Sequence, residues 1–121
     1  MHPGKTYFID VDGTIVKHLS ASMVGVAKEE LLPGVKEYWS TFDQNDFIVI
    51  TTARPEILRS KTESILKDND LRYDYLIMGL PYGPRTLIND TPDVTQPKAY
   101  AINLKRNGGF YFDYMCKHEY A

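Results

Sequence analysis

The chain has little of what marks several large classes of protein. It contains a single cysteine, Cys116, so no disulfide can form within the chain, and a lone thiol fits a reducing compartment. Its longest uninterrupted apolar runs are about five residues, far short of the roughly 20 that cross a bilayer. The first residues contain no apolar stretch of signal-peptide length. We therefore expect a cytoplasmic protein without a membrane-spanning segment.

A large charge excess of either sign is also lacking. The chain has 14 Lys and Arg residues against 16 Asp and Glu residues, so it shows no strong signal for nucleic-acid binding. The three histidines, His2, His18 and His118, show no metal-ligand spacing. With 121 residues, 43% of them hydrophobic, the chain is typical of one globular domain. We treat 1–121 as a single domain, with a core at about 6–104 and an aromatic C-terminal segment at 105–121.

Short apolar runs alternate with amphipathic segments along the chain. Runs of β-branched and aromatic residues predict strands, and apolar residues at helical spacing after a proline predict helices. We expect strands at 6–11, 47–52, 73–79, 85–90 and 99–104, and helices within 31–46 and 54–71. Alternation of this kind with short links predicts an α/β fold, a Rossmann-like parallel sheet with helices on both faces.

Polar side chains follow three of the expected strands. In parallel sheets, ligands bind at the carboxyl ends of the strands. One such pair alone would be read as a helix cap or a turn. Three together indicate a functional site, and they are Asp10 with Asp12, Thr51 with Thr52, and Asn89 with Asp90.

The segment YFIDVDGTIV (7–16) suggests the chemistry of this site. Spacing of two residues in an extended segment puts Asp10 and Asp12 on one face, where like charges repel unless a cation lies nearby or one is protonated. An ionised Asp10 can attack phosphorus, and Mg²⁺, held by Asp10 and Asp90, would remove the repulsion. Asp12 would then protonate the leaving oxygen and activate water, and Thr52 would donate to a phosphoryl oxygen.

Three short motifs resemble those of the haloacid dehalogenase superfamily of phosphotransferases. DVDGT (10–14) resembles its DxDGT signature, IVITTAR (48–54) its second motif and TLIND (86–90) its fourth. The resemblance implies a fold of that family without a cap domain and Mg²⁺-dependent phosphoryl transfer.

The resemblance also assigns roles to individual residues. It places the nucleophile at Asp10. It places at Asp12 an acid/base that also binds the metal through its backbone. The motif-two hydroxyl falls on Thr52, with Thr51 as the alternative, and the motif-four metal ligand on Asp90. Supporting roles would fall to Gly13, Thr14, Arg54, Asn89, Asp93 and Lys98.

The chain departs from the family at its third motif. Many relatives carry a lysine in a GKP element, whereas GLPYGPR (79–85) has Leu80 at that place. Arg85 can supply the missing charge as a phosphate clamp, and Lys98 is the alternative. The leading hypothesis is therefore a capless phosphatase. The alternatives are an inactive binding module of the same fold and a receiver-like domain, which the absence of an aspartate from IVITT disfavours.

The sequence contains no segment long enough to form a cap domain over the site. The segment 15–31 is long enough for a flap but not for a cap domain, so the site should be open in a monomer. An open site excludes water poorly and grips a small substrate weakly. A bulky phosphorylated substrate or a neighbouring subunit would close it. We expect a homo-oligomer in which 15–31 or the aromatic tail (109–120) borders a neighbour's site.

Overall fold

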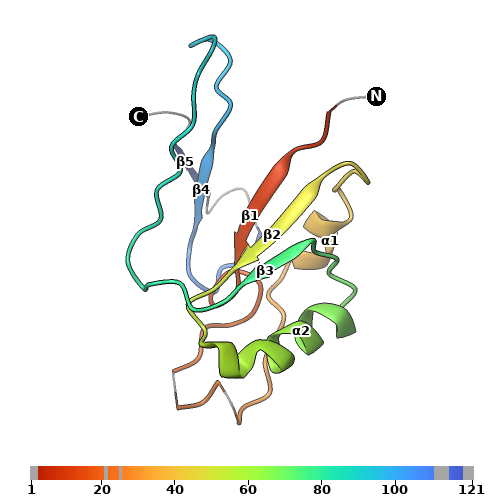
Figure 1. Ribbon diagram of the computed structural model, residues 1–121. Helices are drawn as coiled ribbons and strands as arrows, with labels where there is room; N and C mark the ends of the chain where they lie inside the picture. Colours follow the sequence, from red (N-terminus) through yellow and green to blue (C-terminus); the bar gives the residue numbers. More distant parts are fainter. Residues whose placement is uncertain (1–2, 21, 25, 111–114, 119–121) are drawn as a thin grey trace.

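A three-stranded parallel sheet is the centre of the protein in its computed structural model, which describes residues 3–20, 22–24, 26–110 and 115–118. The strands are β1 (Thr6–Asp10), β2 (Phe47–Thr51) and β3 (Tyr75–Ile77), in the order β1-β2-β3 (Figure 1). Asp10 pairs in register with Thr51, and Thr51 with Ile77, so the carboxyl ends of all three strands meet at one edge. The expected small α/β fold with a parallel sheet is confirmed.

Both described α-helices contribute to the core on one face of this sheet. α1 (Val35–Trp39) connects β1 to β2, and η1 (Glu56–Leu58) followed by α2 (Arg59–Asp68) connects β2 to β3. Since strand order follows chain order, right-handed crossovers put both connections on the same side, which differs from the expected helices on both faces. The shared core consists of Ile9, Val11, Ile15, Val16, Leu32, Val35, Trp39, Ile48, Ile50, Leu66, Leu71 and Leu76.

Helix α1 is much shorter than the sequence indicated. The hydroxyls of Ser40 and Thr41 each donate to a backbone carbonyl three residues earlier, at 2.6 Å. Such local bonds compete with helix continuation. Phe42 lies beyond the helix and still packs on Tyr7, with ring centroids 4.6 Å apart. Phe42 therefore stands at helical spacing from the apolar residues of α1 because it packs onto the same core, although the helix itself does not reach it.

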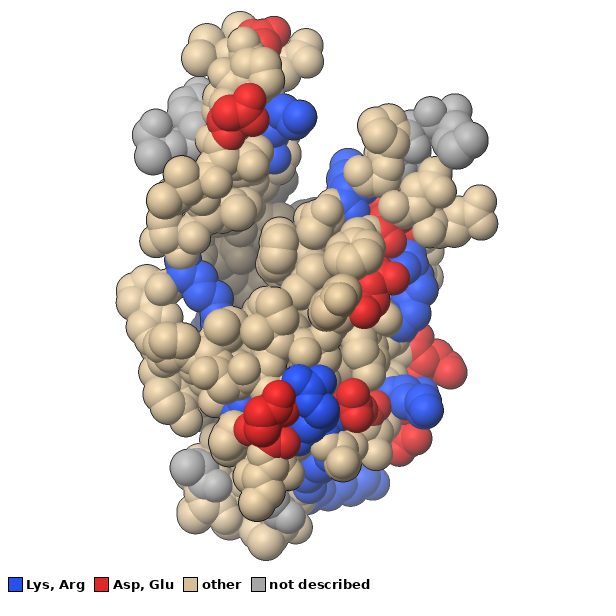
Figure 2. Space-filling model, in the orientation of Figure 1, with Lys and Arg blue, Asp and Glu red and all other residues tan. Residues whose placement is uncertain are grey.

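The chain between β3 and β4 is extended, and no strand forms at 85–90. The described residues 78–100 contain no helix or strand, and 81–96 are exposed throughout. β4 (Ala101–Leu104), expected in the parallel sheet, instead pairs antiparallel with β5 (Met115–His118) in a separate two-stranded sheet. We call residues 80–104 the arm. The arm stands beside the central sheet (Figure 1), and a hollow separates the two on the face shown in Figure 2.

The segment 15–31 forms a loop whose base is fixed in the core. Ile15 and Val16 are fully buried, and Val16 forms an antiparallel bridge with Leu31. The Leu32 N–H donates to the Ile15 carbonyl at 2.9 Å. The loop is thus a short excursion anchored at both ends, as expected for a segment too short to be a cap domain.

The structure describes the aromatic C-terminal segment in part. The Phe110 N–H donates to the Pro33 carbonyl at 3.0 Å, and its ring lies 4.8 Å from that of Tyr38. Residues 111–114 and 119–121 lie outside the described residues, and so does most of the tail for which we predicted a subunit contact. None of the described helices is long and apolar enough to span a membrane.

Candidate functional site

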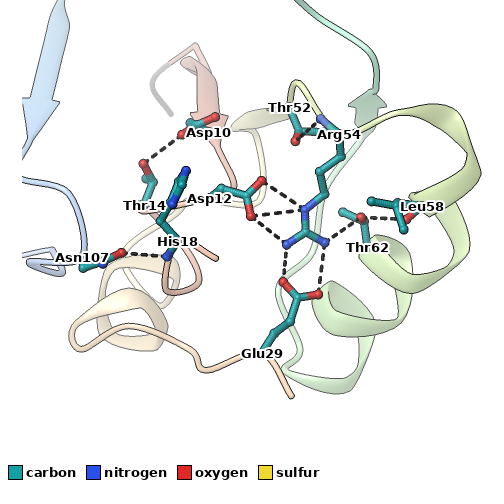
Figure 3. Close-up of polar contacts among 10 residues, drawn as sticks. All are labelled: Asp10, Asp12, Thr14, His18, Glu29, Thr52, Arg54, Leu58, Thr62 and Asn107. Carbon is teal, nitrogen blue, oxygen red and sulfur yellow. Dashed lines mark hydrogen bonds and ion pairs between the residues drawn. The ribbon is translucent and has the colours of Figure 1, made fainter. Parts of the chain in front are cut away.

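Asp10 lies at the carboxyl end of β1, where the chain leaves the sheet (Figure 3). One carboxylate oxygen accepts a bond from Thr14 Oγ1 at 3.3 Å, and the other lies 3.4 Å from Arg85 Nη1. The side chain is 36% exposed. Burial raises the pKa of Asp10 above its usual value, although Arg85, the Val11 N–H and Thr14 all act to lower it. Asp10 is thus a reachable carboxylate whose charge is incompletely compensated, which is typical of functional sites.

The turn after β1 is fixed by its own backbone. The Gly13 N–H donates to the Val16 carbonyl at 2.7 Å, and the Val16 N–H donates back to the Val11 carbonyl at 3.1 Å. Gly13 has φ of +82°, and a Cβ added there would lie 3.1 Å from Arg106 Cγ. Both the conformation and the space therefore favour glycine at this position.

Arg54 holds the second aspartate in a buried ionic cluster (Figure 3). Its side chain is 3% exposed, and its Nε and Nη2 donate to the Asp12 carboxylate at 3.1 and 2.8 Å. Nη1 donates to Glu29 Oε2 and to Thr62 Oγ1, each at 3.1 Å, and Nη2 also pairs with Glu29 Oε1. Burial acts to lower the pKa of Arg54, but the bonds to Asp12 and Glu29 outweigh it and raise the pKa. Arg54 therefore joins the turn after β1, the loop 15–31 and α2.

The two threonines at the end of β2 occupy different environments. Thr51 is the register partner of Asp10 and so shares its face of the sheet. Thr52 has no exposed surface, and its Oγ1 accepts the Arg54 backbone N–H at 3.0 Å. Its hydroxyl hydrogen remains available for donation. Both candidates for the motif-two hydroxyl therefore lie at the expected edge, with Thr51 on the Asp10 side.

The other predicted site residues, Asn89, Asp90, Asp93 and Lys98, lie on the arm. Asn89 Nδ2 donates to the Asp90 carbonyl at 3.5 Å. Asp93 accepts bonds from the Thr95 hydroxyl and N–H at 2.7 and 2.9 Å, which lower the pKa of Asp93. Within the described part of the chain, no three His, Cys, Asp or Glu residues form a group able to hold a metal. The structure thus brings together Asp10, Asp12, Gly13, Thr14, Thr52, Arg54 and Arg85, but it does not add Asp90 to Asp10 and Asp12.

Sequence reasoning did not identify Glu29, Thr62 or Asn107. The Asn107 side-chain oxygen accepts the His18 backbone N–H at 2.7 Å, and the Asn107 N–H donates to the Gly13 carbonyl at 2.9 Å. Glu29 had a weak signal, because a buried arginine needs carboxylates and KEEL (28–31) supplies two. Nothing in the spacing of the sequence indicated the other two.

The oxygen donors at the end of β1 suit a magnesium ion held largely by water and substrate. Mg²⁺ commonly takes one or two carboxylates and completes its shell with water and phosphate. Asp10 and the Asp12 backbone carbonyl would supply the protein oxygens.

Comparisons of the chain with protein-family models, with curated proteins and with solved structures give no significant match. Function is therefore argued from the site itself and from the motifs it contains.

We expect Arg54→Met to lower the free energy of unfolding by about 3–5 kcal/mol, because it leaves Glu29 and Asp12 without their counter-charge. Adding Glu29→Gln should recover part of that loss. Arg59→Met is the matched control, since the side chain of Arg59 is 37% exposed and pairs with Glu56 at 2.8 Å, and surface pairs of this kind contribute little to stability. Urea unfolding followed by Trp39 fluorescence measures all three variants. Similar small losses for both arginines would contradict the buried cluster.

We expect Asp10→Asn to raise the melting temperature at neutral pH, with the gain shrinking as the pH falls. The folded-state pKa of Asp10 is raised, so its contribution to stability is present below the unfolded pKa and lost as the pH rises through the folded one. Asparagine does not titrate. Asp93→Asn should act in the opposite sense, because Thr95 lowers the pKa of Asp93. Thermal unfolding between about pH 4 and about pH 7 tests both, and a gain independent of pH would contradict the environment of Asp10.

Proposed function

We propose that the chain is a Mg²⁺-dependent phosphatase that acts through an aspartyl-phosphate on Asp10. The observation that carries this proposal is the state of Asp10, a partly exposed carboxylate at the end of a parallel strand with a guanidinium 3.4 Å away. It stands first in DVDGT, which resembles the haloacid dehalogenase signature. Carboxylates of this kind act as nucleophiles toward phosphorus.

The reaction would proceed in two displacements. An oxygen of Asp10 attacks the phosphorus of a monoester, the bond to the alcohol oxygen breaks, and Asp12 gives that oxygen a proton. Water then attacks the aspartyl-phosphate and gives a proton to Asp12, which releases phosphate and restores the Asp10 carboxylate. Magnesium, when bound, offsets the negative charge that the carboxylate and the phosphoryl group bring together.

Arg85 supports this proposal through its position. It lies at the start of the arm, with a half-exposed side chain that touches Asp10. A phosphoryl group transferred to Asp10 would come within reach of the same guanidinium, which can bind two of its oxygens. Arg85 would thereby take the place of the lysine that the resemblance leads one to expect at Leu80.

Arg54 supports a role for Asp12 as the proton carrier. Two nitrogens of Arg54, Nε and Nη2, donate to the Asp12 carboxylate. A carboxyl group that carries a proton has an oxygen that no longer accepts both bonds, so Asp12 must give up at least one Arg54 bond when it is protonated. Glu29 continues to bind Arg54 during that exchange, and the guanidinium is not left buried without a partner. Arg54 is thus a positioning residue that returns Asp12 to one orientation.

A catalytically inactive binding module is the second candidate. It is favoured by the place of Asn89, Asp90 and Lys98, which lie on the arm rather than at a strand end. Such a module would use the turn at Gly13 and the charge of Arg85 to bind a phosphate without turnover. A receiver-like domain would instead keep the phosphoryl group on Asp10.

We expect the wild-type protein to hydrolyse p-nitrophenyl phosphate when Mg²⁺ is present and to lose that activity with EDTA. Asp10→Asn should leave less than about a thousandth of the turnover, because the amide is nearly isosteric but is no nucleophile. Asp68→Asn, which removes an exposed carboxylate from the end of α2, is the control and should retain turnover. Equal turnover of Asp10→Asn and wild type in protein free of contaminating phosphatases would refute the covalent role.

We also expect Arg85→Ala to cost more activity than Lys98→Ala, although each removes one positive charge. Losing a fixed charge beside the transferring phosphoryl group should lower turnover by about 10²-fold or more, and it is Arg85, not Lys98, that the structure places against Asp10. Steady-state rates for the two variants decide the order. The reverse order would transfer the third-motif role to Lys98.

A further inference from the structure

The face of the central sheet opposite the helices is apolar, and its two outer strands expose large side chains there, whereas Val49 on the central strand is only 6% exposed. Phe8 pairs in register with Val49, and Val49 with Tyr75, so the three lie side by side on this face. Phe8 and Tyr75 are 57% and 65% exposed, and the Tyr75 ring lies 6.3 Å from that of Phe47. Soluble monomers seldom expose contiguous apolar patches of this kind, which mark interaction sites when they occur.

The arm carries a second set of exposed apolar side chains. Ile88 is 90% exposed, and it lies within the β-rich run that forms no strand in the structure. Burial of such residues normally offsets the entropy lost when a segment is ordered. The exposed set consists of Tyr82, Leu87, Ile88, Val94, Tyr100 and Ile102.

Both ends of the arm are tied to the carboxyl edge of the sheet. The Leu80 N–H donates to the Thr52 carbonyl at 3.0 Å, and beyond the arm the Asn107 N–H donates to the Gly13 carbonyl at 2.9 Å. Between these anchors the arm projects from the molecule, and Figure 2 shows the hollow that separates it from the sheet. In one copy of the chain, large apolar side chains of the arm and of the two outer strands of the sheet are therefore exposed.

We propose that two copies of the chain exchange arms, so that the arm of each copy covers the open sheet face of the other. A two-fold axis would bury both apolar sets in both copies without refolding either chain. A standard interface has about 20–30 residues on each side, and an arm of about 25 residues together with the sheet face supplies that size. Among the described residues β1 pairs with β2 alone, so the run at 85–90 of the partner can add to its other edge.

The exchange would also complete the catalytic site, a step that rests on the proposed function. Asp90 follows Ile88 by two residues, and Asp10 follows Phe8 by two residues on β1. If the run at 85–90 lies parallel to β1 with Ile88 beside Phe8, the partner's Asp90 reaches the level of Asp10. The third carboxylate that the described residues of one chain do not add to Asp10 and Asp12 would then come from the partner.

The dimer is tested by light scattering at micromolar concentration. The wild type should be a dimer, and Ile88→Asp on the arm and Tyr75→Glu on the sheet face should each give monomers with unchanged circular dichroism. Ile57→Asp is the matched control, since Ile57 is 89% exposed but lies on η1, and it should leave the dimer intact. A monomeric wild type, or a dimer that neither Ile88→Asp nor Tyr75→Glu disrupts, would overturn the proposal.

The shared site is tested by mixing Asp10→Asn subunits with Asp90→Asn subunits after each has been shown to be inactive alone. Random pairing should restore about a quarter of wild-type turnover, because half of the dimers would be mixed and each would contain one intact site. Asp10→Asn mixed with Asp12→Asn should restore nothing, since both groups belong to the same chain's site. Absence of recovery in the first mixture would overturn the partner's contribution of Asp90. A wild type without phosphatase activity would refute the proposed function, while the light-scattering result would still decide the dimer.

Discussion

The guanidinium of Arg54 holds together three parts of the chain that are far apart in sequence. It binds Asp12 in the turn after β1, Glu29 in the loop 15–31 and Thr62 on α2. Such a cluster is stable only when every member keeps its partners, because an unpaired buried charge costs several kcal/mol. The path of the loop, the orientation of Asp12 and the docking of α2 are therefore set together.

Each of the two aspartates of the site pairs with a different arginine. Arg54 is buried and serves Asp12, whereas Arg85 is half exposed, belongs to the arm and serves Asp10. The nucleophile proposed here thus takes its nearby positive charge from a segment that extends away from the core. Any change in the position of the arm alters the electrostatics at Asp10. This couples the proposed arm exchange to the proposed chemistry, since the same segment supplies Arg85 to its own chain and Asp90 to its partner.

The sequence allowed the carboxyl edge of the first two strands to be predicted with its side chains. Runs of β-branched and aromatic residues mark β1 and β2, and such runs form strands when a neighbouring strand and the core are close by. Asp10 and Asp12 with Thr51 and Thr52 then follow from position, because parallel strands end at a common edge. The choice of Thr52 over Thr51 was based on the resemblance. Arg85 was predicted from the need for a cation near a phosphoryl group, and the structure places it on Asp10.

The features that could not be predicted from the sequence depend on pairing between residues that lie far apart in the chain. The run TLIND has the β-propensity of a strand, yet a strand needs a neighbour, and it pairs with none of the residues that the structure describes. Asn89 and Asp90 consequently lie on the arm. Strand order cannot be read from periodicity, so the helices were expected on both faces and contribute to one. The pairing of Arg54 with Glu29 joins residues 25 positions apart, and no local pattern specifies it.

A direct search for the covalent intermediate tests the central claim that Asp10 is a nucleophile toward phosphorus. The protein is mixed with a phosphomonoester and Mg²⁺, quenched in acid within the first turnover, and analysed by intact-mass spectrometry and peptide mapping. We expect one phosphoryl group per chain, located on Asp10, that disappears as free phosphate accumulates. Phosphate release without any phosphorylated protein, or a phosphoryl group on a different residue, would contradict the mechanism.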